Sequence, residues 1–134
     1  MVAEARTWVD VEGAVRQWAR QALPSLSGRV FFGFNADANP RFPQLVLFRI
    51  GGPDDRCLIQ FDVWGSSKAE AASTAAALAT AADALSRYTH GGALLHGALV
   101  ESVRWQPDVE SDQPRYVVDV MFTATADGTQ EDAS

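Results

Sequence analysis

The sequence predicts one α+β domain, residues 1–125, built as two layers: a twisted, mainly antiparallel or mixed sheet of five strands with two helices packed on one face. Two segments carry apolar residues at helical spacing, and five shorter segments have the alternation or the short apolar run of strands. Turn residues separate these segments. Their order along the chain is helix, three strands, helix, two strands.

The first helix is expected to begin after Thr7 or Asp10, because Thr-x-x-Asp fits a capping box and either side chain can cap. Pro24 ends it, since proline lacks the N–H donor that a continuing helix needs. Charged side chains take the opposite face. The apolar stripe consists of Val11, Val15, Trp18 and Ala22.

Three strands are expected next, over residues 30–34, 44–50 and 57–64. The second and third are joined by residues 51–55, whose Gly, Pro and Asp suit a hairpin turn. Residues 35–43 are rich in Asn, Asp and Pro, which predicts a mobile loop that faces a partner. The candidate partner-facing positions are Asn35, Asp37, Asn39 and Arg41.

A second helix is expected from Ser67, because Ser67 and Glu70 form a capping box. Between Glu70 and Asp83 it has no charged side chain, although a solvated helix face normally carries charges. One side therefore packs on the sheet and the other on another subunit; a coding bias toward alanine is the alternative explanation. The sheet-facing positions are Ala71, Ala75, Leu78, Ala82 and Leu85. The candidate subunit-interface positions are Ala72, Ala76, Ala79 and Asp83.

Two last strands are expected over residues 99–105 and 116–122, where apolar and polar side chains alternate. Residues 106–114 between them form an acidic hairpin loop. Residues 126–134 are small, polar and acidic, which predicts a disordered tail with too little apolar surface to order itself.

The composition excludes several classes of protein. A net charge of −6 and a pI near 4.7 argue against binding that neutralises nucleic-acid phosphates. No apolar run approaches the ~20 residues that span a bilayer. The first residues lack the charged-then-apolar layout of a signal peptide, so the chain is expected to be made and kept in a cytoplasm. A single cysteine allows no internal disulfide.

Familiar catalytic and ligand-binding motifs are incomplete, so no catalytic, cofactor-binding or metal-binding residue is predicted. Gly28 and Gly33 have phosphate-loop spacing without its lysine, and residues 65–69 lack the second glycine of a nucleophile elbow. His90 and His96 have no neighbours at zinc-ligand spacing, and are interpreted as a residue beside a helix end and a loop residue. Cys57 is interpreted as a small buried hydrophobe.

Asp62 and Asp119 are carboxylates on otherwise hydrophobic strands. Two carboxylates on neighbouring strands could form an acid/base pair. Both lie on the polar phase of their strands, however, which favours positions that face solvent or another subunit and pair with Arg104 or Arg115. Both are therefore counted among the candidate subunit-interface residues.

The sequence resembles the tail-terminator proteins of long-tailed bacteriophages. The resemblance rests on residues 58–65 leading into the alanine-rich helix, and on residues 115–120 after a polar hairpin. The opening helix and residues 29–33 fit the same layout, so it spans residues 9–125.

The resemblance implies a structural protein of the virion tail, assembled in the host cytoplasm, with no enzymatic activity and no cofactor. It implies a ring, usually of six subunits, that binds the tail-tube protein, stops tube polymerisation and meets the head-tail connector while DNA passes through. Another neck or minor tail protein remains an alternative. A small-ligand binder or enzyme built around Trp64, Trp105, Asp62 and Asp119 is a more distant one.

Overall fold

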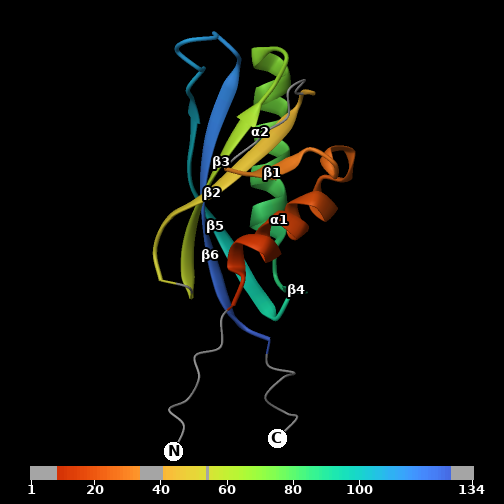
Figure 1. The fold of residues 1–134 in the computed structure, drawn as a ribbon, viewed down its shortest axis with the longest axis vertical. Helices are drawn as coiled ribbons and strands as arrows, with labels where there is room; N and C mark the ends of the chain where they lie inside the picture. Colours follow the sequence, from red (N-terminus) through yellow and green to blue (C-terminus); the bar gives the residue numbers. More distant parts are fainter. Residues whose placement is uncertain (1–8, 34–40, 54, 128–134) are drawn as a thin grey trace, which may run out of the picture.

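A six-stranded mixed sheet with the strand order β1-β2-β3-β6-β5-β4 is the frame of the fold (Figure 1). The structure is a computed structural model and describes residues 9–33, 41–53 and 55–127. Only β1 and β2 are parallel; every other neighbouring pair is antiparallel. The elements are α1 (Val11–Ala22), the 3₁₀-helix η1 (Pro24–Leu26), β1 (Val30–Phe32), β2 (Gln44–Gly51), β3 (Arg56–Trp64), α2 (Lys68–Ala84), β4 (Tyr88–His90), β5 (Ala93–Trp105) and β6 (Arg115–Ala126).

Both helices lie on the same face of the sheet, as the sequence predicted (Figure 1). Asp10 caps α1 by accepting a hydrogen bond from the N–H of Gly13 at 2.9 Å. Ser67 caps α2 by accepting from the N–H of Glu70 at 3.1 Å. The return bond expected of a capping box goes one residue further back, because Glu70 accepts from the N–H of Ser66 at 2.7 Å. This bond lowers the pKa of Glu70.

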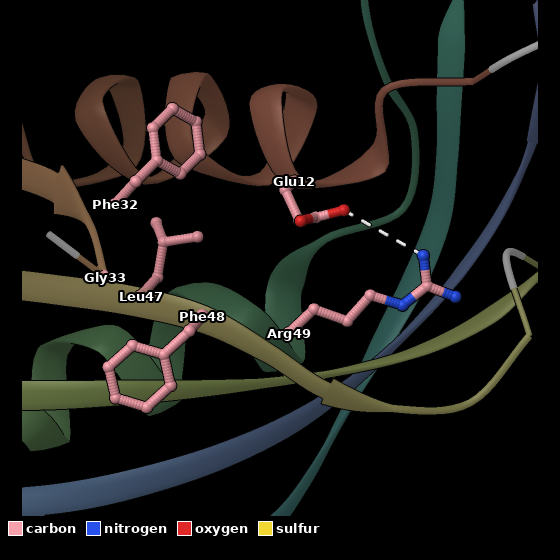
Figure 2. Close-up of a pocket in the computed structure, with 6 residues that line it drawn as sticks. All are labelled: Glu12, Phe32, Gly33, Leu47, Phe48 and Arg49. Atoms are coloured by element: carbon pink, nitrogen blue, oxygen red, sulfur yellow. Dashed lines mark ion pairs between the residues drawn. The ribbon is translucent and has the colours of Figure 1, made fainter.

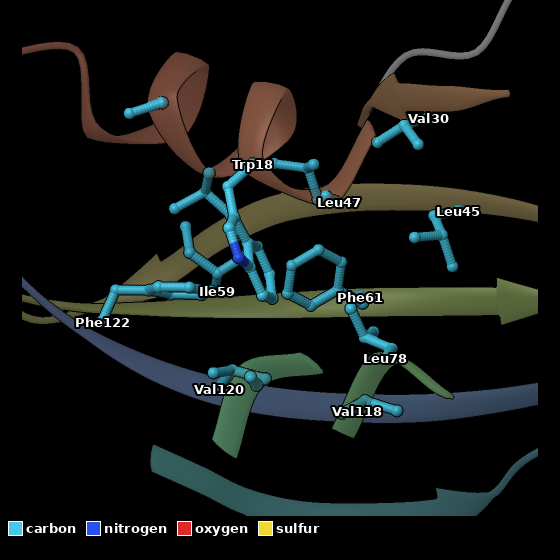
Figure 3. Close-up of a cluster of buried hydrophobic side chains, with 14 of the residues drawn as sticks. Trp18, Val30, Leu45, Leu47, Ile59, Phe61, Leu78, Val118, Val120 and Phe122 are labelled. Atoms are coloured by element: carbon cyan, nitrogen blue, oxygen red, sulfur yellow. The ribbon is translucent and has the colours of Figure 1, made fainter. Parts of the chain in front are cut away.

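Aromatic side chains join the helical layer to the middle of the sheet (Figure 3). Trp18 of α1 meets Phe122 of β6 edge to face, with ring centroids 5.5 Å apart. Phe122 also lies 6.3 Å from Phe61 of β3. From α2, Leu78 packs into the same cluster and is fully buried. Because alternate residues of a strand point to opposite faces, the other phase of β3 and β6 faces away from both helices.

The sheet has one strand more than the predicted five. Tyr88–His90 forms β4, and β5 begins at Ala93 rather than at Leu99. Gly91 and Gly92 have positive φ values of 59° and 82° and make the two-residue turn between these strands. Gly-Gly between strand segments is a hairpin signal, and the expectation of a helix end beside His90 is wrong here. His90 and His96 accordingly lie in strands, not beside a helix end or in a loop.

The ends of other elements match the predictions more closely. β2 and β3 form the expected hairpin, and residues 106–114 form the expected loop between β5 and β6. β6 runs to Ala126, one residue into the expected tail, and the N–H of Asp127 donates to the carbonyl of Gly92 at 2.8 Å. Residues 128–134 and most of the expected loop at 35–43 lie outside the described residues. Within the described ranges, no helix is both long and apolar enough to cross a membrane.

Candidate functional site

Asp62 lies on the sheet face that points away from the helices, between the core residues Phe61 and Val63. Arg115 donates to one of its carboxylate oxygens at 3.4 Å, and Gln60 donates to the other at 3.1 Å. The side chain of Asp62 is only 9% exposed. The pairing expected with Arg115 is therefore confirmed, whereas the expectation that Asp62 faces solvent is wrong for the single chain.

Asp119 forms a second ion pair on the same face. Arg104 donates to its Oδ2 atom at 2.7 Å, and the hydroxyl of Ser102 donates to that oxygen at 3.1 Å. The pairing expected with Arg104 is thereby confirmed. The other oxygen, Oδ1, is buried and has no hydrogen-bond partner among the described residues. A buried carboxylate oxygen without a donor is costly, and the chain's own atoms cover this one.

Burial governs the electrostatics of this face. It raises the pKa of Asp62, and this effect exceeds the opposing effects of the Gln60 hydrogen bond and of Arg115. The negative charge of Asp119 raises the pKa of Asp62 further. Each carboxylate is nevertheless held by its own arginine, on an open sheet face. This arrangement orders polar groups on a sheet face.

The two tryptophans named with Asp62 and Asp119 lie on opposite faces of the sheet, and Trp64 shares the face of both carboxylates. Trp64 stacks against the guanidinium of Arg115, whose central carbon lies 4.9 Å from the ring centroid. Trp105 contacts Tyr116 and Lys68, on the helix side of the sheet. The four residues therefore do not all lie on one face of the sheet.

Two hollows lie on the surface of the described residues, and neither is lined by Asp62 or Asp119. The larger has a volume of about 450 Å³ and lies between α1, β1 and β2 (Figure 2). The residues that line it are Glu12, Phe32, Gly33, Leu47, Phe48 and Arg49. The smaller, of about 260 Å³, is lined by Phe42, Gln44, Trp64, Ser111 and Gln113. Aromatic and aliphatic side chains dominate the larger hollow, and the Glu12–Arg49 ion pair, at 3.9 Å, crosses it.

The long helix α2 divides into a sheet-facing side and an outward side. The predicted core positions Ala71, Ala75, Leu78 and Ala82 are buried. Of the candidate interface positions, Ala76 and Asp83 are exposed, and Ala72 and Ala79 are half-buried. Arg41, in the candidate partner-facing loop, is exposed; Asn35, Asp37 and Asn39 lie outside the described residues.

Sequence reasoning missed a row of exposed apolar side chains on β5 and the loop that follows it. Leu99 is 61% exposed, Val103 46%, Trp105 40% and Val109 92%. Their alternation with polar residues predicted a half-buried strand, but alternation does not show which strand lies at a sheet edge. The sequence itself shows these large apolar residues in and next to the polar loop of residues 106–114, and this could have indicated an exposed apolar surface.

The chain shares its fold with a virion protein. The likeness is to a chain in the virion of a native gene transfer agent particle, with a TM-score of 0.59 and 16% sequence identity. It covers 87% of this chain and 98% of the virion chain. No protein-family model matches the sequence, and no curated protein matches it. At this level of identity the likeness establishes the fold alone.

A shared fold identifies no site residues, so the remaining motifs stand on their own geometry. Ser66 and Ser67 are both engaged with Glu70 at the start of α2. His96 is exposed and bonds Thr125 at 2.7 Å. Cys57 is fully buried, as predicted. In the part of the chain that the structure describes, no three His, Cys, Asp or Glu side chains cluster as a metal site would require.

Proposed function

We propose that this chain is a structural protein of a phage-like virion, and that it forms the ring that caps the tail tube. The observation that carries the proposal is the fold, which the chain shares with 98% of the length of a gene transfer agent virion chain. The resemblance of the sequence to tail terminators supports the finer role. On this proposal the chain ends tail-tube polymerisation and provides the joint to the head connector.

The outward side of α2 supports a role in self-assembly. This side carries alanine, serine and threonine and no charge between Glu70 and Asp83, although it is exposed in the single chain. Small uncharged side chains let a second surface approach closely. A neighbouring subunit that covers Ala76 would remove this surface from water.

The sheet face with Asp62 and Asp119 is the second proposed contact surface. Arg104, which pairs with Asp119, has a 44% exposed side chain and can meet a neighbouring subunit or tube protein. The two ion pairs keep the carboxylates oriented before a partner arrives. Their part is to position the partner, and no chemical step is assigned to them.

Deleting the gene from the genome that encodes the particle tests the tail role, with electron microscopy of the particles as the readout. A tube cap predicts tubes that overgrow their normal length and heads without tails. Tubes of normal length with unattached heads would instead indicate another neck protein. Complete, infective or transfer-competent particles would refute a virion role altogether.

Ring formation is tested with the purified protein, by sedimentation velocity and negative-stain imaging, alone and with tail tubes added. Rings of cyclic symmetry, free or at the tube end, are expected. A chain that stays monomeric under both conditions would refute the cap, whatever the deletion shows.

A further inference from the structure

The strand β5 leaves most of one edge open. It has 13 residues, but β4 pairs with it only between Ala93 and Leu95. Residues 96–105 therefore have no neighbouring strand on that side within the described chain. An open edge with exposed apolar side chains is a surface that binds another chain unless something prevents it.

Two features determine how this edge can be used. Register shifts between Leu95 and Gly97 and between Val100 and Ser102 break the edge into short pieces, which discourages pairing with any passing strand. The register shifts disturb contact through side chains less than they disturb pairing through backbone hydrogen bonds. Leu99 pairs with Met121 on the face away from the helices, and Val103 pairs with Val118 on the core side, so both faces of the edge carry an exposed apolar residue.

The opposite edge of the sheet offers a recess. β1 has only three residues, which pair with β2 as far as Leu47. The hollow of about 450 Å³ lies at this edge, with Phe32 and Phe48 on its walls (Figure 2). Phe32 is 44% exposed and Ile50 is 45% exposed. Among the described residues this edge is therefore also apolar and exposed, but concave.

The two edges also differ in charge. Residues 9–33 and 41–53, which form α1, β1 and β2, carry five arginines and two acidic side chains. The arginines are Arg16, Arg20, Arg29, Arg41 and Arg49. Arg16 and Arg20 donate to backbone carbonyls, which orients them without neutralising their charge.

The β5 side is acidic. Residues 88–114, which form β4, β5 and the loop after them, carry four acidic side chains and one basic side chain. Glu101 lies at the second register shift of the β5 edge and is exposed. The loop that follows β5 adds Asp108, Glu110 and Asp112. Complementary charge at two ends of one sheet favours contact between the different ends of two copies over contact between like ends.

We propose that the β5 edge of one copy of this chain binds the edge formed by β1 and β2 of a second copy. Leu99 and Val103 of one copy pack at the hollow beside Phe32 and Ile50 of the next, and the acidic β5 side lies against its arginines. Two different patches in contact generate a head-to-tail series, which closes into a ring when the rotation permits. This inference rests on the proposed ring and adds the two sheet edges to the outward side of α2 as surfaces that build it.

Disulfide trapping tests the contact in the full chain. Leu99→Cys and Ile50→Cys variants are made separately, and Cys57, which is fully buried, stays as it is. On mild oxidation of the concentrated proteins, the 1:1 mixture is expected to form cross-linked dimers while each variant alone does not. Thr123→Cys, exposed on β6 away from both edges, is the matched control and is expected to cross-link with neither variant.

Three results would overturn the inference: cross-linking of Leu99→Cys with itself, which indicates contact between like edges; equal cross-linking by Thr123→Cys; or no cross-link in the mixture. Circular dichroism and thermal melts check that each variant is folded. An independent variant, Glu101→Arg, is expected to weaken association at least several-fold with an unchanged melting temperature, and undiminished association would contradict the charge argument. If the purified protein caps tail tubes but the cysteine variants do not cross-link, this inference fails and the proposed function stands. If the variants cross-link but deletion of the gene leaves the tails normal, the proposed function fails and the edge contact stands.

Discussion

Adjacent alanines in α2 allow a sharp test of whether its outward side is an interface. Ala75 is 1% exposed and packs in the core, whereas Ala76 is exposed on the other side of the helix. The same substitution, alanine to glutamate, is made at each position. We expect Ala76→Glu to prevent assembly with little effect on folding, and Ala75→Glu to prevent folding.

The magnitudes follow from burial. A glutamate at an exposed helix position costs at most about 0.5 kcal/mol relative to alanine. Glu70 and Asp83 lie six and seven residues from Ala76, beyond the three- and four-residue spacings at which like charges repel on a helix. An unpaired charge buried at Ala75 costs several kcal/mol, out of a typical total stability of about 5–15 kcal/mol.

If a neighbouring subunit covers Ala76, the glutamate of Ala76→Glu is also an unpaired buried charge, and it weakens association. A penalty of about 3 kcal/mol corresponds to association roughly 100-fold weaker, since about 1.4 kcal/mol is a factor of ten. Sedimentation velocity over a concentration series measures association, and urea unfolding followed by circular dichroism measures stability. If Ala76→Glu assembles at the same concentration as the unchanged chain, the outward side of α2 is not an interface. If Ala75→Glu folds normally, the packing of α2 on the sheet is wrong.

Three further predictions concern the single chain. Phe122→Ala should cost about 3–5 kcal/mol, because Trp18 and Phe61 both lose a ring contact, and a urea midpoint close to that of the unchanged chain would contradict this core. Ser67→Ala should lower the free energy of unfolding by about 1 kcal/mol through loss of the α2 cap, with Ser73→Ala, exposed within the helix, as the control that should not. Burial raises the pKa of Asp62 above the ordinary carboxyl value of 3.8, so its contribution to stability is full below that pH and is lost as the pH rises through the folded-state pKa. The stability of Asp62→Asn relative to the unchanged chain should therefore improve between pH 3.5 and pH 7, and an opposite trend in urea unfolding would show that the pairing with Arg115 outweighs burial.

Local patterns in the sequence were sufficient to predict both helices and their caps. Asp10, Ser67 and Glu70 act through hydrogen bonds to residues at most four positions away, so their roles are written in short stretches of chain. The alternation along β3 identified its buried phase for the same reason, since a strand exposes its two faces in turn. Pairing of Asp62 and Asp119 with Arg104 or Arg115 was also expected from the sequence, and the structure decides that Arg115 pairs with Asp62 and Arg104 with Asp119.

The sequence by itself thus determined the fold class, most element positions and the lack of any complete catalytic motif. Only the tertiary structure decided that β6 lies between β3 and β5, that β4 pairs with the first residues of β5 alone, and that the rest of β5 is a sheet edge. It also decided that Asp62 is buried and that Asp119 keeps one oxygen without a donor. Strand order and burial depend on contacts between residues far apart in the chain, and a periodic pattern records which face of a strand is apolar but not which strand lies beside it.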